Sequence, residues 1–161
     1  MPISVNGRQM VADAPPYRLL VDWLRDDLGL TGTHVGCTTS QCGACHVKVD
    51  GEVVKACTLL VGQCEGAEVT TIEGLGSPEA LHPMQAAFRT AHGLQCGFCT
   101  PGMVLAGIAI AEEHGPDVSD ETIRHALEGN LCRCTGYQNI VAAIREGARA
   151  MADAGLTRKA A

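Results

Sequence analysis

The first half of the chain alternates hydrophobic and polar residues with a period of two, the pattern of strands that cover a core with one face. Residues 17–28 interrupt it with hydrophobic positions at helical spacing, and residues 69–72 favour a last strand. Two alternating segments run into dipeptides that favour tight hairpin turns: Ile3 and Val5 before Asn6-Gly7, and Val47 and Val49 before Asp50-Gly51, after which Val53 begins a return strand. Two strands, a helix and then further strands is the order expected of a β-grasp sheet.

Hydrophobic positions in the second half follow a helical period instead. Residues 103–111 are apolar nearly all round, so their helix should be the buried centre of a bundle. Four helices are predicted: one from Pro83 to a stop at Gly93, one capped by Thr100 with Pro101 at its first position, one capped by Ser119, and one over 139–151. The tail, 156–161, is expected to fray.

Together these patterns predict an α+β protein with a β-grasp domain followed by a four-helix bundle. The glycine- and proline-rich stretch at 75–79 is the predicted linker between domains at 1–74 and 80–161.

Composition indicates that each half needs a metal or a disulfide to stabilise its small core. Only 3% of the 161 residues are aromatic, so each half has little aromatic surface to bury, but nine cysteines are available. No apolar run approaches the roughly 18 residues of a membrane span, and the first residues carry no export signal. We therefore expect a cytoplasmic chain with reduced thiols, in which close cysteine spacing indicates metal rather than disulfides. The net charge of −6 gives no support to nucleic-acid binding.

Four cysteines of the first half have the spacing of plant-type ferredoxins, C-x4-C-x2-C…C. They are Cys37, Cys42, Cys45 and Cys57. Glycines at 36 and 43 would let the backbone fold closely around sulfur and direct amides at an anionic cluster. A zinc site fits poorly, because zinc sites favour paired C-x2–4-C clamps separated by a longer loop. The spacing predicts a 2Fe–2S cluster of the plant-ferredoxin-like type.

The second half carries a C-x2-C pair and a C-x-C pair separated by 32 residues. They are Cys96, Cys99, Cys132 and Cys134. This spacing alone is equally compatible with zinc. Helix N-terminal amides after Cys99 would stabilise an anionic cluster.

Three longer segments carry a resemblance to a known family: GCTTSQCGAC (36–45), LQCGFCTPGM (94–103) and GNLCRCTGYQNIV (129–141). They resemble the iron–sulfur subunit of molybdenum hydroxylases, the xanthine oxidase family, with the small chain of carbon-monoxide-dehydrogenase-type enzymes as the nearest form. The resemblance covers roughly residues 2–151 and favours a second 2Fe–2S cluster over zinc. Ser40, where many members have glycine, and His46, where threonine is common, are its small departures.

The resemblance implies a complex in which this chain is non-catalytic. A large subunit would carry molybdenum bound to a pterin, and a medium subunit would carry FAD, as a dimer of heterotrimers. Electrons would pass from molybdenum to the second cysteine set, then to the first set, then to FAD. The match also implies that Gln95 contacts the pterin and that Cys134 is the point of electron entry.

Other residues and functions are weighed against this interpretation. Cys64 is expected to be a small buried hydrophobe, and His34, His46 and His92 are not expected to be ligands because both sets already have four thiolates. Arg133 could offset cluster charge, meet a partner or be simply solvated. A free-standing two-cluster ferredoxin is the alternative function. The substrate of the complex could be carbon monoxide, an aldehyde, a purine or another N-heterocycle.

Overall fold

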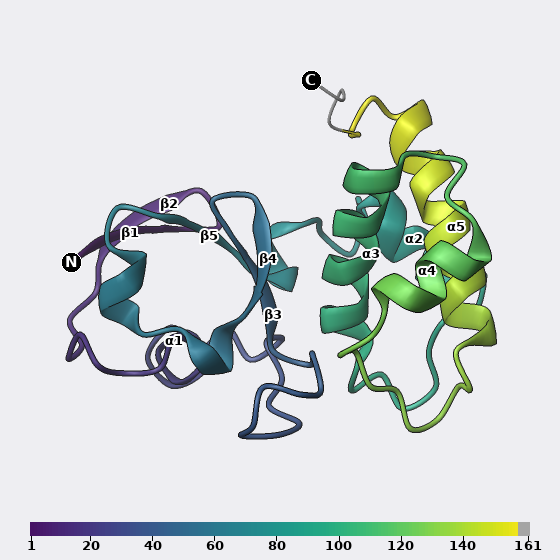
Figure 1. The fold of residues 1–161 in the computed structure, drawn as a ribbon. Helices are drawn as coiled ribbons and strands as arrows, with labels where there is room; N and C mark the ends of the chain where they lie inside the picture. The colour runs from purple at the N-terminus through teal and green to yellow at the C-terminus, as the bar shows by residue number, and fades with distance from the viewer. Residues whose placement is uncertain (158–161) are drawn as a thin grey trace.

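A computed structural model describes residues 1–157 and consists of a sheet half followed by a helical half (Figure 1). The sheet is mixed and five-stranded, in the order β2-β1-β5-β3-β4. Its strands are β1 (Pro2–Val5), β2 (Arg8–Val11), β3 (His46–Val49), β4 (Glu52–Lys55) and β5 (Glu68–Thr70). The helices are α1 (Leu20–Asp22), α2 (Pro83–Thr90), α3 (Thr100–His114), α4 (Asp120–Ala126) and α5 (Gln138–Asp153). The predicted α+β class is confirmed.

Both predicted hairpins form at the expected dipeptides. Asn6-Gly7 joins β1 to β2 and Asp50-Gly51 joins β3 to β4, and all four residues have positive φ angles, as the tight hairpin turns require. β5 completes the sheet between β1, to which it is parallel, and β3, to which it is antiparallel. The buried core of this half includes Ile3, Val47 and Val69.

The helix predicted over 17–28 is shorter and starts later. Tyr17, placed on its buried face, is 75% exposed, and α1 begins at Leu20 and passes into a π-helical turn, Trp23–Asp27. The cause is tertiary, since Leu19 pairs with Leu60 and holds the preceding chain extended. The last strand also ends earlier than predicted, at Thr70, and a 3-10 turn over Ile72–Gly74 follows.

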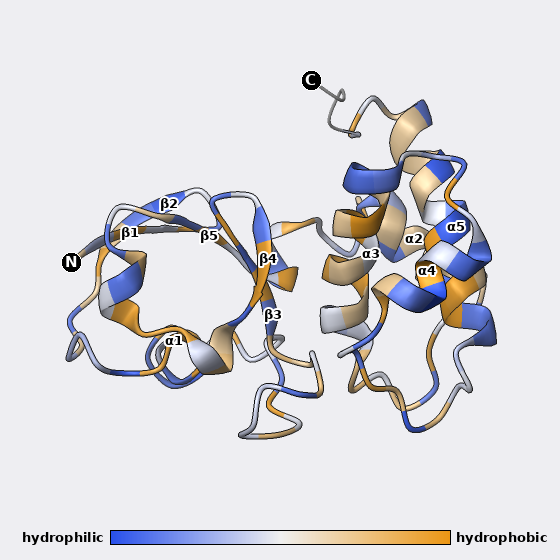
Figure 2. Cartoon of the chain, in the orientation of Figure 1, coloured by the Kyte–Doolittle hydropathy of each residue, from blue (hydrophilic) through white to orange (hydrophobic). Residues whose placement is uncertain are grey.

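The four predicted helices of the second half are present, with one cap corrected. α3 is buried along most of its length, and much of its ribbon has the colour of hydrophobic residues in Figure 2. It starts at Thr100 with Cys99 as N-cap, and the buried Thr100 hydroxyl has no hydrogen-bond partner among residues 1–157, so Thr100 is not the cap. Ser119 does cap α4 by accepting from the Thr122 amide.

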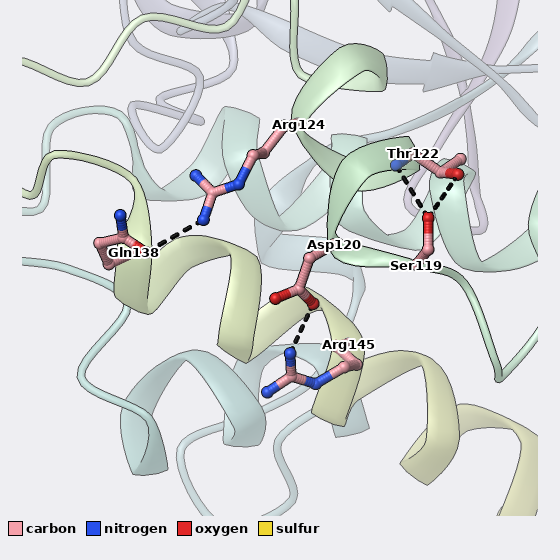
Figure 3. A network of polar contacts seen from close by, with 6 residues as sticks. All are labelled: Ser119, Asp120, Thr122, Arg124, Gln138 and Arg145. Carbon is pink, nitrogen blue, oxygen red and sulfur yellow. Dashed lines mark hydrogen bonds and ion pairs between the residues drawn. The ribbon is translucent and has the colours of Figure 1, made fainter.

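Polar contacts hold α4 against α5 (Figure 3). Arg124 donates to the Gln138 side chain at 3.0 Å, and Arg145 forms an ion pair with Asp120. Beneath them the apolar faces of α2, α3 and α5 share one core, which includes Phe88, Met103 and Ile144.

The two halves pack directly against each other, with α3 lying on β3 and β4 (Figure 1). Lys48 of β3 and Glu112 of α3 form an ion pair at 2.8 Å, with both side chains mostly buried. The chain that joins the halves also packs, because Ile72 and Leu75 contact the helical core. Of the tail predicted to fray, residues 158–161 lie outside the described part. None of the described helices is long and apolar enough to cross a membrane.

Candidate metal centres

The loops that carry the eight predicted ligands lie at the same end of the two halves (Figure 1). Three cysteines of the first set lie in the loop before β3, and Cys57 lies in the 3-10 turn Ala56–Thr58 directly after β4. In the second set, Cys99 precedes α3, and Cys132 and Cys134 lie in the loop that leads to α5. The β3–β4 hairpin and the starts of α3 and α5 therefore bring predicted ligands to this end of the chain.

The first set divides into two pairs of neighbouring thiols. Cys37 lies beside Cys42, whose backbone amide donates to Cys37 Sγ at 3.4 Å. That amide, with those of Thr39 and Gln41, lowers the pKa of Cys37 to about 6. Cys45 lies beside Cys57 in a more buried position, and burial raises the pKa of Cys45 to about 11.

The second set divides in the same way. Cys99 contacts Cys132 on the side that faces the protein, and burial together with this contact raises the pKa of Cys99 to about 12. Burial opposes ionisation of Cys132, but hydrogen bonds from Thr135 and neighbouring amides outweigh it and lower the pKa. Cys134 contacts Cys96, and that contact raises the pKa of Cys134; both thiols are exposed. This set therefore has an inner pair and an outer pair.

Two pairs of thiols per set fit a cluster of two irons, each of which needs two terminal thiolates to complete tetrahedral sulfur coordination. A single zinc ion would need all its ligands around one point. Within residues 1–157, no three His, Cys, Asp or Glu side chains are arranged to hold one metal ion. The donor set thus fits 2Fe–2S clusters in both positions, and the ligand assignments remain predictions.

Glycines allow the close approach that the sequence predicted. A Cβ atom on Gly36 would lie 3.1 Å from Cys42 Sγ, and Gly43 has a φ of +72° and packs against Asn130. Ser40 also has a positive φ, which explains why glycine suits this position. The Ser40 carbonyl accepts a hydrogen bond from Lys55 Nζ at 2.7 Å.

Helix N-termini point toward the second set. α3 begins directly after Cys99, as expected, and α5 begins four residues after Cys134. Amide groups at such termini favour negative charge. The contribution of α5 was not predicted, although the spacing of its hydrophobic residues placed its start close to Cys134.

Further contacts connect the two cysteine loops, and no pattern in the sequence predicts them. The Leu131 amide donates to the Cys42 carbonyl at 2.9 Å, which places one backbone hydrogen bond between ligand loops of the two sets. His34 Nδ1 lies 2.7 Å from the Phe98 carbonyl oxygen, and the two rings stack with centroids 4.7 Å apart. A cavity of about 390 Å³ between the loops is lined by predicted ligands of both sets, Cys42, Cys96, Cys99 and Cys132, and by Arg133.

Gln95 lies beside the outer pair, is exposed and has no side-chain hydrogen bond to the described residues. Its amide is therefore free for a partner, while the predicted contact itself stays a prediction. Cys64 is 1% exposed within the sheet-half core, as expected of a small hydrophobe. His46 is buried near Gly102 of α3, where burial lowers its pKa.

Comparisons with known proteins agree with two cluster-binding domains. Residues 3–70 match the 2Fe-2S iron–sulfur cluster binding domain family, and residues 71–145 match a second 2Fe-2S binding domain family. Caffeine dehydrogenase subunit gamma of Pseudomonas sp. (strain CBB1) is 48% identical over 145 residues, which cover 89% of this chain and 87% of that protein. The aldehyde oxidoreductase iron–sulfur-binding subunit PaoA of Escherichia coli (strain K12) is 42% identical over 160 residues, which cover 91% of this chain and 70% of that one.

A solved structure matches the whole fold. A chain of quinoline 2-oxidoreductase from Pseudomonas putida 86 superimposes with a TM-score of 0.91 at 41% identity, over 98% of this chain and 97% of that one. The chain belongs to the family of small iron–sulfur subunits of molybdenum hydroxylases.

Proposed function

We propose that this chain is the electron-transfer subunit of a molybdenum-dependent hydroxylase or dehydrogenase. The observation that carries the proposal is the arrangement of two sets of paired thiols whose loops are joined by the hydrogen bond from the Leu131 amide to the Cys42 carbonyl. Each 2Fe–2S cluster supplies one-electron chemistry when bound. The chain's own residues hold the clusters, keep their loops in contact and cover the inner thiols.

Exposure of the outer pair supports the proposed orientation of the relay. Cys96 and Cys134 form the exposed pair, and Gln95 offers an unpartnered amide beside them, so this side suits a pterin-bearing large subunit, with Cys134 as the point of electron entry. The first set would then serve a medium subunit that carries FAD. We propose a dimer of such heterotrimers in the cytoplasm. We also propose that residues 1–74 form a β-grasp domain, that 75–79 are a linker, and that 80–161 form a four-helix bundle.

Metal content tests the cluster assignment directly. The purified complex should contain about four iron and four acid-labile sulfide per copy of this chain, because each cluster holds two of each. Cys57→Ala should halve both counts, whereas Cys64→Ala, which changes a buried thiol outside both sets, should leave them unchanged. Zinc without iron in the anaerobically purified chain would contradict the proposal.

The proposed pterin contact has its own test. Gln95→Ala should slow the reduction of the clusters by substrate or weaken retention of the molybdenum cofactor, because a Gln amide can both donate to and accept from a pterin edge. Gln41→Ala, which changes an exposed glutamine beside the first set, is the matched control. If both variants behave like the wild type, the contact is wrong.

A free-standing two-cluster ferredoxin is the alternative. The exposed Leu94, at 38%, and the unpartnered Gln95 favour a docked partner instead. Co-purification with a large molybdenum chain and a flavin chain decides between the two. The same preparation, assayed with a dye acceptor against carbon monoxide, aldehydes, purines and other N-heterocycles, would identify the substrate. The relatives' names include both caffeine and aldehyde enzymes, so both classes belong in the panel.

A further inference from the structure

The loop that carries Cys132 contains a hydrogen-bond network that the proposed function does not account for. The Thr135 hydroxyl oxygen lies 3.1 Å from Cys132 Sγ. The Tyr137 amide donates to the same hydroxyl at 3.1 Å. The Tyr137 hydroxyl accepts from the Cys132 amide at 2.9 Å and donates to the Asn130 carbonyl at 3.0 Å.

The direction of the bond between Thr135 and Cys132 follows from its neighbours. A cysteine that binds metal is a thiolate and has no hydrogen to donate. The Thr135 oxygen already accepts from the Tyr137 amide, so its own hydrogen is available for the sulfur. The hydroxyl of Thr135 therefore donates to Cys132 Sγ.

Tyr137 adopts a conformation that points to a specific role. Its φ is +69°, in the left-handed region that large side chains rarely occupy, and it directly precedes α5. Such strain persists only where surrounding contacts impose it. Here the hydrogen bonds of Tyr137 to Thr135, Cys132 and Asn130 impose it, and they hold Thr135 and Cys132 in fixed relative positions.

We propose that Thr135 is a positioning residue that raises the reduction potential of the second cluster, and that Tyr137 holds it in place. The inference rests on the proposed function, because it requires a cluster on Cys132. A reduced cluster carries one more negative charge than an oxidised cluster, and a hydroxyl that donates to a ligand sulfur stabilises the reduced form more. Cys132 belongs to the inner pair and adjoins Leu131, whose amide contacts the first set, so the effect acts where the electron leaves the second cluster.

The experiment is a redox titration of the intact complex, followed by EPR, which reports each reduced cluster. Thr135→Val keeps the shape and removes the hydroxyl, and Thr135→Ser keeps the hydroxyl. Thr100→Val is the matched control, because Thr100 follows the other inner ligand, Cys99, and its hydroxyl has no partner among the described residues.

Thr135→Val should lower the ratio of reduced to oxidised second cluster at a fixed potential by about three- to ten-fold. At 59 mV per ten-fold for a one-electron couple, this is a fall in midpoint of about 30–60 mV. Thr135→Ser and Thr100→Val should stay within about two-fold of the wild type, and the first cluster should not change.

An unchanged midpoint in Thr135→Val, or an equal shift in Thr100→Val, overturns the inference. Should Thr135→Val lose iron, Thr135→Ser decides: a wild-type midpoint supports the role of the hydroxyl, and a displaced one overturns it. The proposed function fails in a different way, since the wild-type complex would then lack the iron or the signal of a second cluster.

Discussion

We expect Gly102→Ala to disturb the packing between the two halves more than the addition of one methyl group suggests. A Cβ atom at Gly102 would lie 2.2 Å from the carbonyl oxygen of Gly43 and 3.2 Å from Ala44 Cα. Both neighbours are backbone atoms and cannot rotate away. Real Cβ contacts essentially never fall below 3.0 Å, so α3 and the cysteine loop must separate by roughly 0.8 Å, the difference between 3.0 and 2.2 Å.

Two effects of opposite sign act at this position. Alanine is favoured over glycine within a helix by at most about 1 kcal/mol. Overpacking against an immobile neighbour costs about 1–3 kcal/mol. We therefore expect a net loss of about 1–2 kcal/mol, which corresponds to roughly 5–30-fold faster unfolding if the transition state relieves the clash.

The rate at which cluster absorbance is lost in urea at a fixed temperature measures this effect, because unfolding that releases a cluster is irreversible. Gly107→Ala, in the same helix, is the matched control. Its Cβ atom would lie 3.0 Å from Ile144 Cγ1 and 3.1 Å from Met84 Sδ, which are side-chain atoms and can shift by a few tenths of an ångström more easily than backbone. We expect this variant to stay within about 1 kcal/mol of the wild type. A Gly102→Ala protein that bleaches no faster than the wild type would refute the close docking of α3 on the cysteine loop.

Three further predictions concern other contacts. His82 Nδ1 accepts from the Met84 amide and burial lowers the His82 pKa, so the folded state should lose stability as the pH drops below about 6.5. His82→Asn keeps a neutral cap, so its rate of cluster loss in urea should rise less than that of the wild type between pH 7.5 and pH 5.5. Lys48→Met and Glu112→Gln should each destabilise by about 1–2 kcal/mol and the double variant by less than their sum, as a double-mutant cycle would show; strict additivity would mean that the pair contributes nothing. Thr100→Val should unfold no faster than the wild type and should gain up to about 1 kcal/mol of stability, since it removes a buried hydroxyl that has no partner in the described part of the chain. Markedly faster unfolding would mean that this hydroxyl has a partner.

The fold was predictable wherever local chemistry decides it. The two hairpins follow from Asn6-Gly7 and Asp50-Gly51, and the helices of the second half follow from hydrophobic spacing and breakers. Residues 17–19 were not predictable from local spacing, because Leu19 pairs with Leu60, far along the chain. Local chemistry also failed at Thr100. Its side chain is a good N-cap, but α3 begins at Thr100 itself, so the N-cap position falls on Cys99.

In the candidate site, too, only features that depend on residues close in sequence were predictable. Spacing predicted the first four cysteines as cluster ligands, and the family resemblance predicted the second four and Gln95, because both depend on residues that are close in sequence. The division into inner and outer pairs was not predictable, since Cys99 and Cys132 meet only after α3 and α4 have folded. The role proposed for Thr135 depends on a hydroxyl that must accept from Tyr137 and face Cys132 at once, which no spacing reveals.

The contacts between the two cysteine loops explain how the chain can hold two centres at a constant separation. The Leu131 amide meets the Cys42 carbonyl, and Gly102 lies against the Gly43 carbonyl, so backbone meets backbone at both points. A backbone contact has no rotamers, and its geometry changes only if a helix or a loop moves as a whole. Substitutions on exposed side chains should therefore leave the separation of the centres unchanged, whereas a single added methyl group at a junction glycine should alter it. The glycines of the cysteine motifs thus serve two purposes: they let amides approach sulfur, and they let one half of the chain approach the other.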